Sequence, residues 1–311
     1  MILNTLILGL IFAVLGFGIF LSFKILNFTD LTAEASFTLG AACSVMFCGF
    51  KLPVLGLLVA FIAGACAGVI TALLHTKLHI DKVLSGILTL TAFYTVNLAI
   101  TKFAPNVNLP KMALTLFPKN NDVAALFITL GITLFIGVAI WLFFKTKLGL
   151  SIRACGDNET MIQTQSVSTD MLKIVGLALS NALIAFSGAL FMQYQRFYDS
   201  TFGTGMMVVG VATIIIGETI LFFRHNLGAM LVAITAGSLI YRFIYMLILV
   251  NLGEPRIMKL VSSLALVIVI AATEITKKVR DKNAYKKTKP IIPVAVSTDD
   301  NPLEVEDAED K

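Results

Sequence analysis

Few residues of this chain have types and spacings that could support catalysis or metal binding. His75 and His79 have the i, i+4 spacing of a helical metal pair, but no third ligand lies near them in the sequence. The 4 cysteines show no metal-binding or redox spacing. The chain has no Ser/His/Asp or Cys/His nucleophile arrangement and no Gly-Lys-Ser/Thr phosphate loop. We therefore expect no metal site, no cofactor, no catalytic residue and no ATP binding by this chain itself.

The composition is typical of an integral membrane protein. Hydrophobic residues make up 57% of the 311 residues, charged residues make up 14%, and the mean hydropathy is +0.89. A soluble domain has about 45–50% apolar and about 25% charged residues, so this chain lacks the polar surface that solubility requires. The long apolar runs favour helices, because lipid offers the backbone no hydrogen-bonding partners.

The apolar runs predict an all-α polytopic membrane protein with about nine transmembrane helices, each near the ~20 residues that a bilayer requires. The predicted spans are 3–23, 33–50, 53–76, 83–101, 123–144, 171–193, 205–223, 227–250 and 256–275. Basic residues between 277 and 289 follow the last span, so the positive-inside rule places the C-terminus in the cytoplasm and the N-terminus outside. We expect a transmembrane domain over 1–276 and a disordered cytoplasmic tail over 277–311, basic and then acidic. Because the basic residues adjoin a span, nucleic-acid binding is a poor explanation for them.

Ionisable residues inside membrane spans commonly mark a transport path, and this chain has few. Asp30 and Glu34 lie one helical turn apart at the start of the second span, where solvation at the membrane interface or stabilisation of a helix N-terminus would also explain them. For Glu218, inside the seventh span, a structural ion pair and a transport role are equally consistent. No Asp/His/Lys relay crosses the middle of the membrane, which argues against a proton-driven pump.

Residues 30–96 and 199–271 show the same order of features. Each begins with an acid followed by small and hydroxyl residues, continues through a small-residue span, and reaches a second acid before another apolar run. The first copy starts inside and the second outside, so we predict an inverted repeat with a solute path at the interface of the copies. The candidate path residues are Glu34, Ser36, Thr38, Asn97, Asn181, Thr201 and Thr204. Close helix packing is the alternative explanation for the small and polar residues of the sixth span, which contains Asn181. Asn97 suits a bond to a neighbouring helix as well as one to a solute.

Two polar segments interrupt the apolar runs. The stretch between Lys145 and Leu172 is too long and too polar for a simple turn, and it is predicted to lie in the cytoplasm. A protein that only conducts a solute does not need such a segment, whereas one driven by a soluble partner does. The Pro- and Asn-rich loop 102–122 is the longest external segment; it is either a solvated connector or a surface that meets an acidic external partner.

Three strings resemble the permeases of bacterial binding-protein-dependent ABC importers. The resemblance covers residues 20–275 and is nearest to the branched-chain amino acid and ribose branch, and within it to permeases grouped with tryptophan or tyrosine uptake systems. The strings are LNFTDLTAEASFTLGAA, LSGILTLTAFYTVNL, and the long, more specific GLSIRACGDNETMIQTQSVSTDMLKIVGLALSNALIAFSGALFMQYQRFYDSTFGTGMMVVGVATIIIGE.

The resemblance implies an assembly of separate subunits. An extracellular or periplasmic solute-binding protein would deliver the solute, two permease copies (preferably a homodimer) would enclose the path, and a cytoplasmic ATP-binding subunit would bind the loop 156–170. Within that loop Gly156 would break the helix, and Asp157 and Asn158 would cap a short coupling helix. The residues expected to couple to the ATPase are Gly156, Asp157, Asn158, Glu159, Thr160 and Met161. The Glu-Ala-Ala signature of other ABC importer permeases is absent here, so that motif does not assign individual coupling residues.

Two interpretations of function follow. The first is a multi-pass permease subunit in the bacterial plasma membrane, forming the path for a small organic solute such as an amino acid. Phe93, Tyr94 and Phe202 could stack on an aromatic ring. The alternative is an ATP-independent secondary transporter or channel. It would require an ion-coupling cluster near the middle of the membrane, which the sequence does not contain, and it would leave the segment 145–171 without a role.

Overall fold

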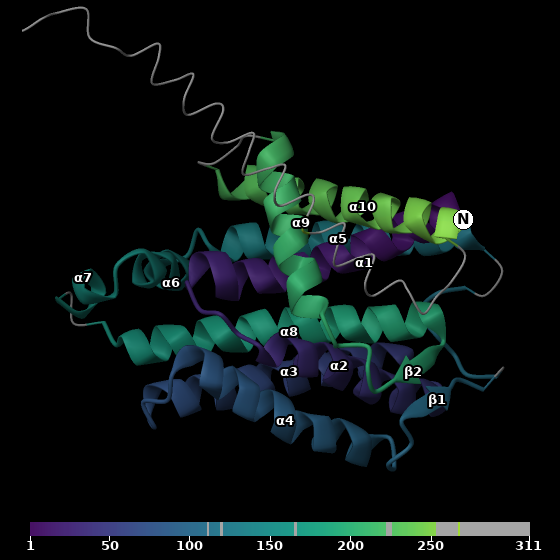
Figure 1. Ribbon diagram of the computed structural model, residues 1–311, viewed down its shortest axis with the longest axis horizontal. Helices are drawn as coiled ribbons and strands as arrows, with labels where there is room; N and C mark the ends of the chain where they lie inside the picture. Colours follow the sequence, from purple (N-terminus) through teal and green to yellow (C-terminus); the bar gives the residue numbers. More distant parts are fainter. Residues whose placement is uncertain (111, 119–120, 165–166, 222–225, 253–266, 268–311) are drawn as a thin grey trace, which may run out of the picture. The chain divides into compact units, whose positions relative to one another are not determined.

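A computed structural model describes residues 1–110, 112–118, 121–164, 167–221, 226–252 and 267 (Figure 1). All of these lie in the first of the two compact units into which the chain divides, 1–270 and 271–311. The predicted ninth span, apart from residue 267, and the predicted tail lie outside the described residues. The described elements are α1 (Ile2–Ile19), the π-helix η1 (Phe20–Ile25), α2 (Thr32–Gly49), α3 (Pro53–Thr76), α4 (Lys82–Ile100), β1 (Asn106–Asn108), α5 (Asp122–Phe143), α6 (Lys147–Asp157), α7 (Glu159–Thr164), α8 (Thr169–Gln195), β2 (Phe197–Asp199), α9 (Met206–Leu221) and α10 (Leu227–Leu252).

Six helices of the described chain are long and apolar enough to cross a membrane. They are Ile2–Ile25, Pro53–Thr76, Lys82–Ile100, Asp122–Phe143, Thr169–Gln195 and Leu227–Ile248. Helices α2 and α9 form where spans were predicted but are not among these six; the apolar part of α9, Met206–Thr219, is shorter. The protein is therefore mostly helical and polytopic, as expected. Nine spans and the inverted repeat stay predictions.

Several helix starts are explained by local sequence. Pro53 is at the first position of α3, where its missing N–H costs no hydrogen bond. The carboxylate of Asp81 accepts a hydrogen bond from the backbone N–H of Val83 at 2.9 Å and so caps α4. Thr146 caps α6 in the same way, accepting from Gly149 N at 3.3 Å.

Helix α8 lies at the centre of the helical packing, in contact with α1, α2 and α3 (Figure 1). Two of its hydroxyls donate to carbonyls of α1: Ser180 to Gly18 at 2.7 Å and Ser187 to Ile11 at 2.8 Å. Where α8 meets α2, a Cβ on Gly188 would lie 2.0 Å from the carbonyl oxygen of Phe37, so only glycine permits this approach. The interpretation of these small residues of α8 as packing residues is confirmed.

A two-stranded antiparallel sheet, which the sequence analysis did not foresee, joins two loops. Strand β1 comes from the predicted external loop 102–122, and β2 directly follows α8. Val107 lies opposite Tyr198, whose side chain is fully buried. Figure 1 shows β1 and β2 at one end of α8 and helices α6 and α7 at the other. The two predicted polar segments are thus at opposite ends of the central helix.

Candidate functional site

A hollow of about 360 Å³ lies between α2, α4 and the segment that follows β2. Five of the seven residues predicted to line a solute path are among its lining residues. The lining is Glu34, Ala35, Thr38, Leu90, Thr91, Tyr94, Asn97, Ser200, Thr201, Gly203 and Thr204. The structure therefore brings together polar groups that come from three separate parts of the sequence.

The segment 203–205 is held against α2 by two hydrogen bonds. The Oε1 atom of Glu34 accepts from the backbone N–H of Gly205 at 2.9 Å, and the hydroxyl of Thr38 accepts from the N–H of Gly203 at 3.0 Å. A Cβ on Gly203 would lie 1.9 Å from the carbonyl oxygen of Glu34, so the backbone approach at this wall of the hollow requires glycine.

Helix α4 supplies the opposite wall with one amide and one aromatic ring. Asn97 is 1% exposed and donates from Nδ2 to the carbonyl of Ala35 at 3.3 Å. Tyr94, one helical turn earlier, is 51% exposed. Of the three aromatic residues considered for stacking, Tyr94 alone is part of the lining of this hollow.

Ser36 and Asn181 lie elsewhere, in a buried polar network between α2 and α8. Ser36 Oγ donates to Asn181 Oδ1 at 2.7 Å, and Asn181 Nδ2 donates to Asp30 Oδ2 at 2.6 Å. Asp30 is 1% exposed and also accepts from the backbone N–H of Thr32 at 2.9 Å. No basic side chain within the described residues forms an ion pair with Asp30. These groups hold the start of α2 against α8.

The hollow is joined to the external loop through the small sheet. The N–H of Ser200 donates to the carbonyl of Pro105 at 2.9 Å, directly beside the paired strands. Arg196, at the end of α8, donates to the hydroxyl of Thr115 at 2.9 Å. A displacement of the loop 102–122 would therefore act on the segment that lines the hollow.

The predicted coupling segment forms two helices, and the expected position of the break is wrong. Helix α6 continues through Gly156 and ends at Asp157; the break falls at Asn158, whose backbone is extended. The side chain of Asn158 accepts from Met161 N at 3.1 Å and from the hydroxyl of Thr160 at 2.7 Å, so it caps α7 as expected. Asp157 does not cap α7.

The glycine at position 156 is explained by packing rather than by helix breaking. A Cβ at Gly156 would lie 1.8 Å from the carbonyl oxygen of Ile25, in η1. The glycine therefore permits α6 to touch the end of the first membrane helix. A π-helical turn such as η1 frequently occurs at functional sites.

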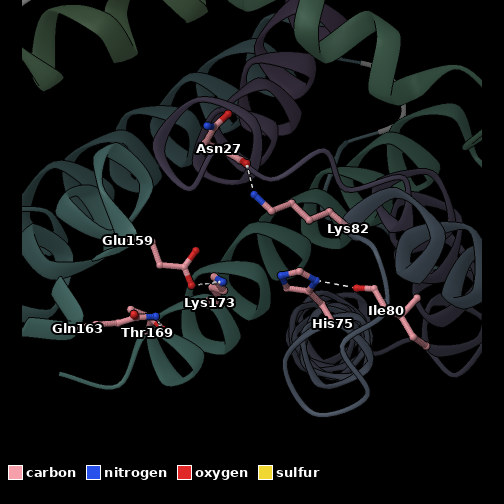
Figure 2. A network of polar contacts seen from close by, with 8 residues as sticks. All are labelled: Asn27, His75, Ile80, Lys82, Glu159, Gln163, Thr169 and Lys173. Carbon is pink, nitrogen blue, oxygen red and sulfur yellow. Dashed lines mark hydrogen bonds and ion pairs between the residues drawn. The ribbon is translucent and has the colours of Figure 1, made fainter. Parts of the chain in front are cut away.

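Helix α7 is attached to α8 by an ion pair. Lys173 Nζ lies 2.5 Å from Glu159 Oε1, and Gln163 Nε2 donates to the Thr169 hydroxyl at 3.5 Å (Figure 2). The hydrogen bond from Lys173 holds the pKa of Glu159 below its ordinary value. Figure 2 also shows Lys82 donating to the carbonyl of Asn27 at 3.1 Å.

His75, shown in the same view, is engaged within the protein. Its Nδ1 lies 2.8 Å from the carbonyl oxygen of Ile80 (Figure 2). Its ring also packs nearly perpendicular to the ring of Phe28, with 5.2 Å between the ring centroids. No cluster of three or more metal-binding side chains occurs among the described residues.

A second cavity, of about 220 Å³, was missed by the sequence analysis. It contains an ion pair between Lys24 Nζ and Glu218 Oε1 at 2.9 Å, and Arg153 and Asp157 of α6 also line it. Of the two explanations left open for Glu218, the structural ion pair is observed. Sequence spacing could not identify Lys24 as the partner, because 194 residues separate the two.

Comparison with known proteins gives the family. The sequence profile described as "Branched-chain amino acid transport system / permease component" matches residues 1–271. The chain belongs to this family. Homologues in it are permease subunits of ABC importers, in which ATP hydrolysis lies on separate subunits. This permease is therefore a multi-pass membrane component of an ABC-type importer.

Individual relatives support this assignment. The permease is 33% identical over 290 residues to a tyrosine transport system permease protein of Clostridioides difficile, covering 91% of this chain and 95% of the relative. It is 32% identical over 272 residues to the uncharacterized protein RP368 of Rickettsia prowazekii, covering 86% and 95%. An autoinducer 2 import system permease protein, LsrC of Photorhabdus luminescens, is 25% identical over 174 residues, covering 54% and 50%.

A solved structure has a similar fold. PsaBC from Streptococcus pneumoniae in complex with Fab matches with a TM-score of 0.51 at 14% identity, covering 88% of each chain. At this identity the similarity concerns the fold alone.

Proposed function

We propose that this permease forms the membrane path for a small organic solute of the amino acid class, with aromatic amino acids such as tyrosine as the leading candidates. The observation that carries the proposal is the hollow between α2, α4 and the segment 200–204, in which five predicted path residues meet. Its hydroxyl and amide groups suit a small polar solute, and the ring of Tyr94 suits an aromatic one. The similarity to a tyrosine transport permease supports the same solute class.

A second copy of the chain would complete the path. Helices α3, α4 and α5 are much less buried than α1 and α8: in the 18-residue apolar stretch of α4, 28% is buried inside the single chain, against 89% in that of the first span. The hollow opens beside the exposed ring of Tyr94 on α4, so a neighbouring copy placed there would close it. We propose a homodimer on this ground.

The two ends of α8 would contact different partners. An external solute-binding protein would deliver the solute to the loop 102–122, in which Pro105 is hydrogen-bonded to Ser200 of the segment lining the hollow. A cytoplasmic ATP-binding subunit would bind α6 and α7. The contact of Gly156 with Ile25 and the ion pair of Glu159 with Lys173 would transmit its movement to η1 and α8. The positive-inside pattern supports an external N-terminus and a cytoplasmic C-terminus in the plasma membrane.

Reconstitution tests this function. The permease would be co-purified in mild detergent with its partner ATPase and solute-binding protein, and placed in liposomes with labelled tyrosine. Uptake that requires both ATP and the binding protein, and that stops when 156–170 is replaced by a Gly/Ser linker, would support the proposal. A chain that purifies alone and transports without ATP would instead be a secondary transporter.

A further inference from the structure

Asn97 presents a buried acceptor that has no partner inside the protein. Its Nδ2 atom donates to the carbonyl of Ala35, which sets the orientation of the amide and leaves Oδ1 without a hydrogen bond. Buried polar atoms without partners are rare and costly in folded proteins. Asn97 is one of the residues that line the hollow, so a hydrogen-bond donor that enters the hollow is a candidate partner for this atom.

Glu34 brings a negative charge to the same hollow. Its Oε1 accepts from Gly205 N, whereas Oε2 accepts no hydrogen bond from any residue that the structure describes. Within those residues no Lys, Arg or His forms an ion pair with Glu34 either. A partly desolvated carboxylate without a counter-ion favours a cationic hydrogen-bond donor.

The remaining lining is consistent with a cation and contains no positively charged group for an anion. No Lys, Arg or His is among the residues that line the hollow. The hydroxyl of Thr91 already donates to the carbonyls of Ile87 and Leu88 in its own helix. Tyr94 offers a ring face, which attracts both aromatic groups and cations.

We propose that this hollow recognises the protonated amine of the solute, with Glu34 and Asn97 as the two acceptors. The inference rests on the proposed function, since it names the part of the solute that this chain contacts. A carboxylate on the same solute would find no basic side chain in this lining. The hollow thus binds an ammonium group, whether it belongs to an amino acid or to an amine without a carboxylate.

Three probes with the same phenol ring separate the amine from the carboxylate. They are tyrosine, which has both groups, tyramine, which has only the amine, and 3-(4-hydroxyphenyl)propionate, which has only the carboxylate. Saturation-transfer-difference NMR suits weak ligands and would be recorded on the permease–ATPase complex in nanodiscs, without binding protein. We expect saturation of tyrosine and tyramine and none of the propionate. Saturation of tyrosine alone, or of the propionate as strongly as of tyramine, would overturn the proposal.

Two variants locate the effect. Glu34→Gln keeps an oxygen that can accept from Gly205 N but removes the charge, so we expect tyramine to bind about tenfold more weakly or worse. Thr235→Val, in α10, is the control: Thr235 is not among the residues that line the hollow and its hydroxyl donates to the carbonyl of Leu231 in its own helix, so tyramine binding should not change. An unchanged affinity in Glu34→Gln overturns the assignment. The probe series on the unaltered chain does not depend on the variant folding.

The amine-site proposal and the proposed function can be tested separately. Binding-protein-stimulated ATP hydrolysis, measured on the same nanodiscs, reports on the importer. Stimulated hydrolysis without amine selectivity would overturn the amine site alone. Amine-selective saturation in a complex that shows no stimulation would leave the amine site standing and overturn the proposed function.

Discussion

Asn181 on α8 donates a hydrogen bond at 2.6 Å to the carboxylate of Asp30, 151 residues earlier in the chain. The other end of the same amide accepts from the hydroxyl of Ser36. Asn181 therefore connects the start of α2 to the central helix through both of its polar atoms. The walls of the candidate hollow depend on this junction, because Glu34 and Thr38 lie on the helix that it positions.

Exchanging the two side chains tests this junction. Asn181→Asp places two carboxylates together and Asp30→Asn opposes two amides, so each single change should destabilise the protein by about 2 kcal/mol. The double exchange restores one donor and one acceptor and should recover most of the loss. Thermal unfolding midpoints of the four proteins in detergent measure this. Additive losses would show that the two residues do not act as a pair.

Close packing of α8 on α2 predicts a strong effect of one methyl group. Gly188→Ala would bring a Cβ to 2.0 Å from the carbonyl oxygen of Phe37, so α2 and α8 must separate at a cost of about 1–3 kcal/mol. Gly131→Ala, in α5, is the control, since nothing lies within 4 Å of its added Cβ. Detergent melting should drop for Gly188→Ala only; equal midpoints would contradict the packing seen here.

The contact between α6 and η1 predicts that a side chain placed between them uncouples ATP hydrolysis from solute uptake. In Gly156→Ala the new Cβ would meet the carbonyl of Ile25 at 1.8 Å, which forces α6 away from the membrane helix. We expect uptake to fall severalfold while ATP hydrolysis by the complex continues. Ser151→Ala changes a residue of the same helix whose hydroxyl donates to the carbonyl of Lys147 one turn earlier, and it should behave as the unaltered protein does. Parallel losses of uptake and hydrolysis in Gly156→Ala would argue for misassembly.

The ion pair of Glu159 predicts a pH dependence of stability. Its folded pKa lies below the ordinary 4.5 because Lys173 donates to the carboxylate. A lowered folded pKa stabilises the protein above the unfolded value and loses that contribution as the pH falls through the folded one. Since Glu159 is 40% exposed, the contribution should be below about 1 kcal/mol.

The variant Glu159→Gln removes this titration. Unfolding midpoints compared between pH 6 and about pH 3.5 should converge for the two proteins at the acid end. A constant difference between them over the whole range would show that the ion pair contributes no charge-dependent stability.

Much of the helical pattern could be predicted because its causes are local. Apolar runs must become helices in lipid, Asp81 caps the residues next to it, and Asn158 caps α7 through atoms within three residues. The same local reasoning failed at Gly156. A glycine weakens a helix by propensity alone, yet here it stays helical, because its missing side chain permits contact with Ile25.

The candidate path residues show the same limit. All seven residues were predicted because they are polar and lie in apolar stretches of the sequence. The sequence did not predict that five of them would line the hollow and that the other two would lie in the buried network between α2 and α8. Ser36 and Thr38 are two residues apart on one helix, so they point in different directions, Ser36 toward Asn181 and Thr38 toward Gly203.

The sequence by itself determined that this protein is a helical membrane protein, where most helices lie, and which family it resembles, because composition, hydropathy and motifs are properties of contiguous residues. The tertiary structure decided which distant groups meet: Glu218 with Lys24, Asp30 with Asn181, and β1 with β2. Such contacts depend on how closely the helices pack and at what rotation. Those are set by side-chain volumes and glycine contacts over the whole fold, which no local pattern contains.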